Sequence, residues 1–286
     1  MEGEYTFCLG GMMIEDLWLF RETLLAAVLA GVGCSVIGVL IFCLRIPFVG
    51  VLISHAALAG AVLAHFLGWP ELPVAMAVSL LSVFMVGPLA DRTEIDLNLS
   101  LGILFSLMMG LSFLGMSLTP EPKTALLGLL WGNILLVTGK EVLAIAAATV
   151  VVLVMIGLGF KEFKAILYNR TIAAALGIWE PFFFYSLLVL CGIVVSVNLQ
   201  ILGGLMIYSL LVNPAAGAYQ LSYSLKQMLL IAILLGVGAS MAGFFCSYVW
   251  SLPTGASIVI FSSLEFALCV LFSPKRRKVF QGGVDG

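Results

Sequence analysis

Charged residues are scarce in this chain of 286 residues: only 10% are Asp, Glu, Lys or Arg, whereas 62% are hydrophobic. The mean hydropathy is +1.20. A soluble domain of this size could not bury so many apolar side chains. The composition therefore excludes a water-soluble domain and predicts an integral membrane protein.

Several motifs are also absent. The sequence has no GxxxxGK[ST] phosphate loop, so the chain cannot itself be an ATPase, and it has no HExxH or other zinc-hydrolase pattern. Its six cysteines form no CxxC pair, and five of them lie in apolar runs, where a thiol packs as a small hydrophobic group. The acidic N-terminus lacks the basic start and cleavage site of a secretory signal, so we expect it to be retained.

The charges divide the sequence into nine candidate membrane spans. A hydrocarbon core of about 30 Å needs roughly 20 apolar residues in a helix. The charge-free stretch 181–225 has 45 residues, enough for two spans, and Asn198 and Gln200 mark the expected turn between them. The other seven spans are 23–44, 46–67, 72–90, 97–118, 142–160, 227–250 and 254–272. The predicted fold is an all-α, polytopic membrane helix bundle with about nine transmembrane helices.

Basic residues predict the orientation of this bundle. Segment 124–139 has only 16 residues, so we expect it to lie along the outer face. With the N-terminus outside, ten of the thirteen basic residues then fall inside, in agreement with the positive-inside rule. We expect one transmembrane domain over residues 1–286, with an extracytoplasmic segment at 1–22 and a cytoplasmic tail at 273–286.

Residues 160–178 form the largest charged feature, on the expected cytoplasmic side. Apolar residues recur there every three or four positions and the run ends at Gly177, which predicts a short amphipathic helix with a glycine stop. Such a helix can lie on lipid headgroups or dock a cytoplasmic partner. The pattern alone leaves both possibilities open.

Five stretches occur in a distinctive order: CLRIPFVGVLISHAALAG (43–60), LSLGILFS (99–106), FKEFKAILYNRTIAAALGI (160–178), LQILGGLMIYSLLVNPAAGA (199–218) and LPTGASIVIF (252–261). Together they resemble the permease subunits of metal-ion ATP-binding-cassette importers, the zinc, manganese and iron uptake family. The resemblance implies a multi-pass protein of the prokaryotic plasma membrane. It also implies that the chain carries a divalent metal ion, binds no permanent cofactor and uses ATP only through a partner.

The partners implied by the resemblance are two copies of a cytoplasmic ATPase, a second permease copy, most simply as a homodimer, and an extracytoplasmic metal-binding protein. Membrane lipid surrounds such a permease, and nucleic acid plays no part. Segment 160–178 matches the region that couples the family's permeases to the ATPase. The residues assigned to coupling on this basis are Lys161, Glu162, Phe163, Lys164, Asn169, Arg170 and Gly177. Asn169 stands where the family commonly has Asp.

His55 is a candidate pathway residue because an ionisable group inside a membrane is costly and usually functional. The family segment usually reads Gly-Asp-x-x-Ser-His, and this chain keeps Gly50, Ser54 and His55 but has Val51 at the Asp position. Positions 51 and 55 share a helix face, so the family carboxylate can lie beside the imidazole. Because Val51 provides no carboxylate, His55 can serve here as a metal ligand or as a hydrogen-bond link to another helix.

Two more polar residues are candidates. Glu265 is the only acid deep in the apolar spans, and we hypothesise that it faces the pathway or another helix and partly supplies the missing carboxylate. The alternative is a neutral Glu265 that is hydrogen-bonded to a neighbour. Asn213 precedes Pro214, which kinks a helix and frees a carbonyl, so this point suits gating, weak ion contact or a simple packing kink. Two rival functions stay open: a permease for a metal chelate or other small solute, and an intramembrane enzyme that uses His55 and Glu265 as base and acid.

Overall fold

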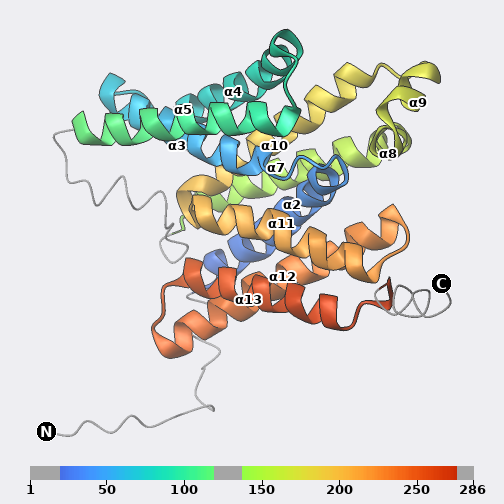
Figure 1. Cartoon of the computed structure of the whole chain (residues 1–286). Helices are drawn as coiled ribbons and strands as arrows, with labels where there is room; N and C mark the ends of the chain where they lie inside the picture. The colour runs from blue at the N-terminus through green and yellow to red at the C-terminus, as the bar shows by residue number, and fades with distance from the viewer. Residues whose placement is uncertain (1–19, 119–136, 276–286) are drawn as a thin grey trace, which may run out of the picture.

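The computed structural model describes residues 20–118 and 137–275 (Figure 1). The expectations for the extracytoplasmic segment, for most of 124–139 and for most of the tail lie outside these residues. The described part has nine helices of 18 or more residues and two short helices. The long ones are α2 (Arg21–Cys43), α3 (Val49–Leu67), α4 (Glu71–Thr93), α5 (Leu97–Leu118), α7 (Gly139–Leu158), α10 (Glu180–Leu202), α11 (Gly204–Leu221), α12 (Leu225–Trp250) and α13 (Thr254–Leu271).

The nine long helices coincide with the nine predicted spans. Eight of those described are long and apolar enough to cross a membrane. The exception, α11, has 18 residues and contains Asn213, Pro214 and Gln220, which make it less apolar. The all-α, polytopic membrane fold is therefore confirmed.

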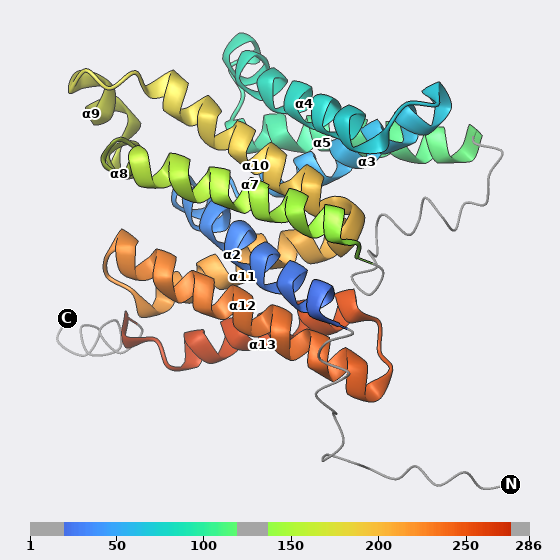
Figure 2. The same ribbon diagram turned by 180° about the vertical axis from the view of Figure 1, so that it is seen from behind.

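Helix α2 lies in the middle of the bundle (Figures 1 and 2). It packs against α7, α11 and α12, whereas α3 packs against α4 and α5 on one side. On the other side α11, α12 and α13 pack against one another, and α10 contacts both α3 and α4. Two groups of helices thus flank a central layer.

Glycine allows the central helices to approach each other closely. A Cβ atom added at Gly38 of α2 would lie 1.9 Å from the carbonyl oxygen of Leu211 on α11. A Cβ added at Gly236 of α12 would lie 1.9 Å from Oγ of Ser35 on α2. Helices in lipid associate through such close van der Waals packing, because no hydrophobic effect drives them together there.

The turn within 181–225 lies later than expected. Asn198 and Gln200 both belong to α10, and the break comes at Gly203, whose φ of 76° suits glycine. The buried Asn198 side chain donates from Nδ2 to the carbonyl oxygen of Val194, at 2.7 Å. Its Oδ1 atom is buried without a hydrogen-bond partner among the described residues. Asn198 nevertheless lies inside α10, so the expectation that it marks the turn is wrong.

The helix ends gather at two opposite ends of the bundle. The short helices α8 (Phe160–Tyr168) and α9 (Arg170–Ala175), the corner between α11 and α12 and the last described residues share one end (Figures 1 and 2). The α3–α4 and α12–α13 corners share the other. The basic residues of α8, α9 and the α11–α12 corner therefore lie together, as the positive-inside prediction requires; which end faces the cytoplasm stays a prediction.

Candidate metal pathway and coupling region

His55 lies in the middle of α3, in a half-buried position. Its ring packs edge-on against Phe105 of α5, with 5.0 Å between the ring centroids. Its Nδ1 atom is buried and has no hydrogen-bond partner among the described residues. The expected hydrogen-bond link from the imidazole to another helix is therefore not made at Nδ1, and this nitrogen is available for an incoming ligand.

The neighbouring polar residue, Ser54, donates its hydroxyl hydrogen within its own helix. Its buried Oγ donates to the carbonyl oxygen of Gly50 at 2.8 Å. A Cβ atom added at Gly204 would lie 3.6 Å from the Cβ atom of Ser54, so α3 approaches the first turn of α11 here. Ser54 can still accept a hydrogen bond or contact a cation through its oxygen lone pairs.

The imidazole has no acidic neighbour on its own helix, since Val51 precedes it by one turn. No group of three or more His, Cys, Asp or Glu side chains in the described ranges could hold a metal ion. A permanently bound ion normally has at least three protein ligands.

Asn213 belongs to a hydrogen-bonded cluster between α11 and α13. Its Nδ2 atom lies within hydrogen-bond distance of the hydroxyl oxygens of Ser209, Ser262 and Ser263, at 3.0, 3.0 and 3.1 Å, and shares its two hydrogens among them. The hydroxyls of Ser209 and Ser262 lie 2.6 Å apart. The Asn213 amide thus joins α11 to α13, and α11 continues through Pro214 as one helix. The sequence reasoning found Asn213 but missed the serines, for which the only signal was the Ser262-Ser263 pair near Glu265.

Glu265 lies on the same helix, α13, in a half-buried position. Its Oε2 atom is buried without a hydrogen-bond partner in the part of the chain that the structure describes. Its Oε1 atom lies 3.0 Å from the place that a Cβ atom at Gly238 would occupy, so the glycine of α12 makes room for the carboxyl group. The described contacts place the Glu265 carboxyl group against α12. None of them is a hydrogen bond or an ion pair with His55.

The predicted coupling helix is in fact two helices. Asn169 has extended backbone between α8 and α9, and its side chain accepts a hydrogen bond from the Ile172 amide at 3.1 Å. The expectation of one continuous helix is wrong because Asn169 acts as an N-cap for a new one. Gly177 has a φ of 83°, which agrees with the predicted glycine stop.

The coupling set divides into anchors and exposed residues. Phe163 is buried and packs edge-on against Phe183 of α10, at 5.4 Å between centroids. Arg170 forms an ion pair with Glu180 and lies 4.1 Å above the ring of Phe184. Lys161 and Lys164 are exposed, and Glu162 is partly exposed. Phe163 and Arg170 therefore attach the two short helices to α10, while the ammonium groups of Lys161 and Lys164 stay exposed.

Comparison with known proteins identifies close similarity over most of the chain. Residues 17–273 match the family described as "ABC 3 transport family". The chain is 30% identical to the "Manganese import system permease protein ScaB" of Streptococcus gordonii, over 92% of this chain and 95% of that protein. It is 27% identical to the "Manganese transport system membrane protein MntC" of Listeria monocytogenes, over 91% of this chain and 92% of that protein.

A solved structure also has the same fold. The structure described as "PsaBC from Streptococcus pneumoniae in complex with Fab" superimposes with a TM-score of 0.85 and 27% identity. The superposition covers 94% of this chain and 98% of the other. The similarity therefore extends over the full set of membrane helices, including α11.

Proposed function

Because this chain belongs to the ABC 3 transport family, we propose that it is the membrane-spanning subunit of an importer for a divalent transition metal ion, with ATP hydrolysed by a separate subunit. The observation that carries the proposal is the similarity, over 92% of the chain, to a protein named as a manganese import permease. Manganese is the first candidate substrate. Zinc and iron are the alternatives, because oxygen and imidazole ligands suit all three ions.

In this proposal His55 contacts the ion as it passes. The support is the buried Nδ1 atom without a described partner, together with the absence of any described three-ligand cluster. Ser54 adds a hydroxyl oxygen beside it, and Asn213 and Glu265 supply polar groups on α11 and α13 further along. A site with few ligands suits transport, since an ion that is held tightly would not leave.

The proposed partners follow from the same family membership. Two cytoplasmic ATPase subunits contact α8 and α9, a second permease copy completes the membrane part, and an extracytoplasmic protein delivers the ion. ATP binding shifts the permease between outward-open and inward-open states. The firm attachment of Phe163 and Arg170 to α10 supports this role, because motion of α8 and α9 then moves a membrane helix with them.

Metal uptake tests the proposal directly. Radiolabelled manganese, zinc and iron are supplied separately to cells that express the permease with the ATPase and binding-protein genes of its operon. We expect manganese to accumulate above the level of the strain without the permease. His55→Ala should lower the uptake by about tenfold or more, as loss of groups at a metal site typically does. His65→Ala, which changes the only other histidine of the chain, is the matched control and should transport normally.

Two results would contradict parts of this proposal. If none of the three ions accumulates above the strain without the permease, the metal-ion function is wrong. If uptake appears only when the metal is supplied as a chelate, the substrate is the chelate, and the absence of a carboxylate at Val51 would agree with that outcome.

A further inference from the structure

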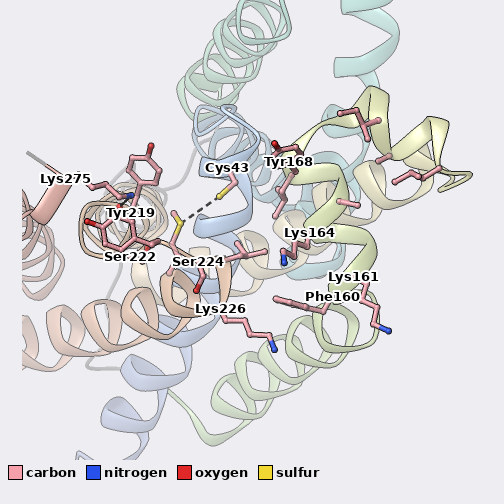
Figure 3. A pocket seen from close by; sticks show the side chains of 18 residues that line it. Cys43, Phe160, Lys161, Lys164, Tyr168, Tyr219, Ser222, Ser224, Lys226 and Lys275 are labelled. Atoms are coloured by element: carbon pink, nitrogen blue, oxygen red, sulfur yellow. Dashed lines mark hydrogen bonds between the residues drawn. The ribbon is translucent and has the colours of Figure 1, made fainter. Parts of the chain in front are cut away.

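A cavity of about 850 Å³ opens beside the coupling region (Figure 3). One side is formed by α8 and α9, and the other by the end of α11 and the start of α12. Cys43 at the end of α2 lies at its inner part, where its Sγ atom is 4.0 Å from Sδ of Met228. The cavity therefore lies where several membrane helices end, at one end of the bundle.

The charges that line this cavity are all positive. They belong to Lys161, Lys164, Lys226 and Lys275. No Asp or Glu is among its lining residues in the described part of the chain. Such a concentration of one sign attracts an anion, and low-dielectric walls strengthen the attraction.

The lysines differ in whether their ammonium groups already contact other described residues. Lys275 donates to the carbonyl oxygen of Tyr219 and lies 3.8 Å above its ring. Figure 3 shows Lys164 and Lys226 on the two sides of the cavity, whereas Lys161 extends away from them. Lys226 lies 5.7 Å from the ring centroid of Phe160, and neither Lys164 nor Lys226 forms an ion pair with a described residue. Both ammonium groups can therefore contact a phosphate, although Lys164 is also among the residues assigned to coupling, so that a lipid and an ATPase would share it.

The rest of the lining is mainly apolar. Side chains such as Leu167, Ile172 and Leu225 form walls that a small inorganic anion would leave uncovered. Tyr168 and Tyr223 are 86% and 65% exposed, and tyrosines concentrate at the membrane–water interface. The cavity thus combines basic side chains with apolar walls at the end of the bundle where α2 and α11 end and α12 begins.

We propose that this cavity binds an anionic phospholipid, with its phosphate between Lys164 and Lys226 and an acyl chain along the apolar walls. Basic pockets between helices at a membrane surface recognise anionic headgroups in this way. The bound lipid would contact α8 and α9 on one side and α12 on the other. A bound lipid would therefore affect how α8 and α9 pack against α12.

Lipid retention tests this site without any measurement of transport. The full chain is purified from membranes with the subunits that accompany it, and is placed in nanodiscs of phosphatidylcholine with or without phosphatidylglycerol. Native mass spectrometry then counts the lipids that stay bound to each permease copy. We expect one phosphatidylglycerol per copy. The change K164Q with K226Q should weaken its binding by roughly thirtyfold, and K226Q alone by about fivefold, since each lysine contributes to anionic headgroup attraction.

A matched control removes two basic groups elsewhere: R92Q with K140Q, both at exposed positions outside the cavity. This control should retain the lipid as the wild type does. Equal retention of phosphatidylcholine and phosphatidylglycerol, or equal retention in the cavity variants and the control, would overturn the proposal. Binding of inorganic phosphate without retention of phosphatidylglycerol would identify a soluble phosphate compound as the occupant and overturn the lipid proposal. Because metal and ATP are absent from the assay, its outcome is independent of the metal-uptake test.

Discussion

Single glycines determine how closely the central helices pack. The contact between Gly38 and the Leu211 carbonyl oxygen leaves no room for a methyl group, since a Cβ atom would lie 1.9 Å from that oxygen. The oxygen belongs to a helix backbone, so it cannot move aside as a flexible side chain could. We expect Gly38→Ala to force α2 and α11 apart and to destabilise the protein by about 1–3 kcal/mol or more. Thermal unfolding of the purified protein in detergent measures this.

Gly102→Ala is the control for this experiment. No atom lies within 4 Å of a Cβ added at Gly102 of α5, and alanine is the better helix former. Its midpoint of thermal unfolding should equal or slightly exceed that of the wild type. Equal midpoints for the Gly38 and Gly102 variants would show that the close contact between α2 and α11 contributes nothing to stability.

At the residue scale, the sequence could identify candidates but not their neighbours. A lone His55 or Glu265 is conspicuous in an apolar helix, because ionisable groups are rare there. Which groups meet depends on how helices rotate against each other, and periodicity does not determine that rotation. The sequence therefore could not predict that the Asn213 amide nitrogen lies among three serine hydroxyls, or that Glu265 lies against α12 with no described bond to His55.

The break between α8 and α9 at Asn169 determines the shape of the coupling region. The side chain caps α9 by accepting from the Ile172 amide, and α9 has only six residues. Asn169→Ala should destabilise this helix by about 1 kcal/mol. If α9 contacts the ATPase, we expect the ATP hydrolysis that the reconstituted importer shows during transport to fall by up to about fivefold. An energy of about 1 kcal/mol changes the equilibrium constant between the formed and unformed helix by that factor.

Asn169→Asp is the matched control, because an Asp side chain accepts the same hydrogen bond and is an equally good N-cap. It should keep the activity of the wild type, in agreement with the Asp that the family commonly has there. If the Ala and Asp variants have equal activity, the cap does not contribute to coupling. If both lose activity, the amide group of Asn169 itself is required.

The spans were predictable because charges interrupt apolar runs at the same places where helices end in lipid. The boundaries at Leu97 and Thr254 agree with the structure, whereas the turn in 181–225 does not. Asn198 stays inside α10, where its Nδ2 donates to the Val194 carbonyl oxygen, and the chain turns at Gly203, whose positive φ suits glycine. Sequence alone could not distinguish this glycine from the other 29.

At the scale of the whole molecule, the number of crossings determines which side each terminus occupies. Nine long helices are described, and an odd number of crossings puts the two termini on opposite sides. The described basic residues of α8, α9 and the α11–α12 corner gather at one end of the bundle, which the positive-inside rule assigns to the cytoplasm. The proposed contact of an ATPase with α8 and α9 requires that this end faces the cytoplasm.

The orientation prediction is that the N-terminus lies outside and the C-terminus in the cytoplasm. Two versions of the full chain, one with an epitope tag before Met1 and one with the same tag after Gly286, are expressed in cells that are then converted to spheroplasts. We expect antibody to bind the N-terminal tag on intact spheroplasts and the C-terminal tag only after permeabilisation. Each tag serves as the control for the other, because the chain is otherwise the same. Tags on the same side would mean an even number of crossings, and the less apolar α11 would then be the first helix to test for an incomplete crossing.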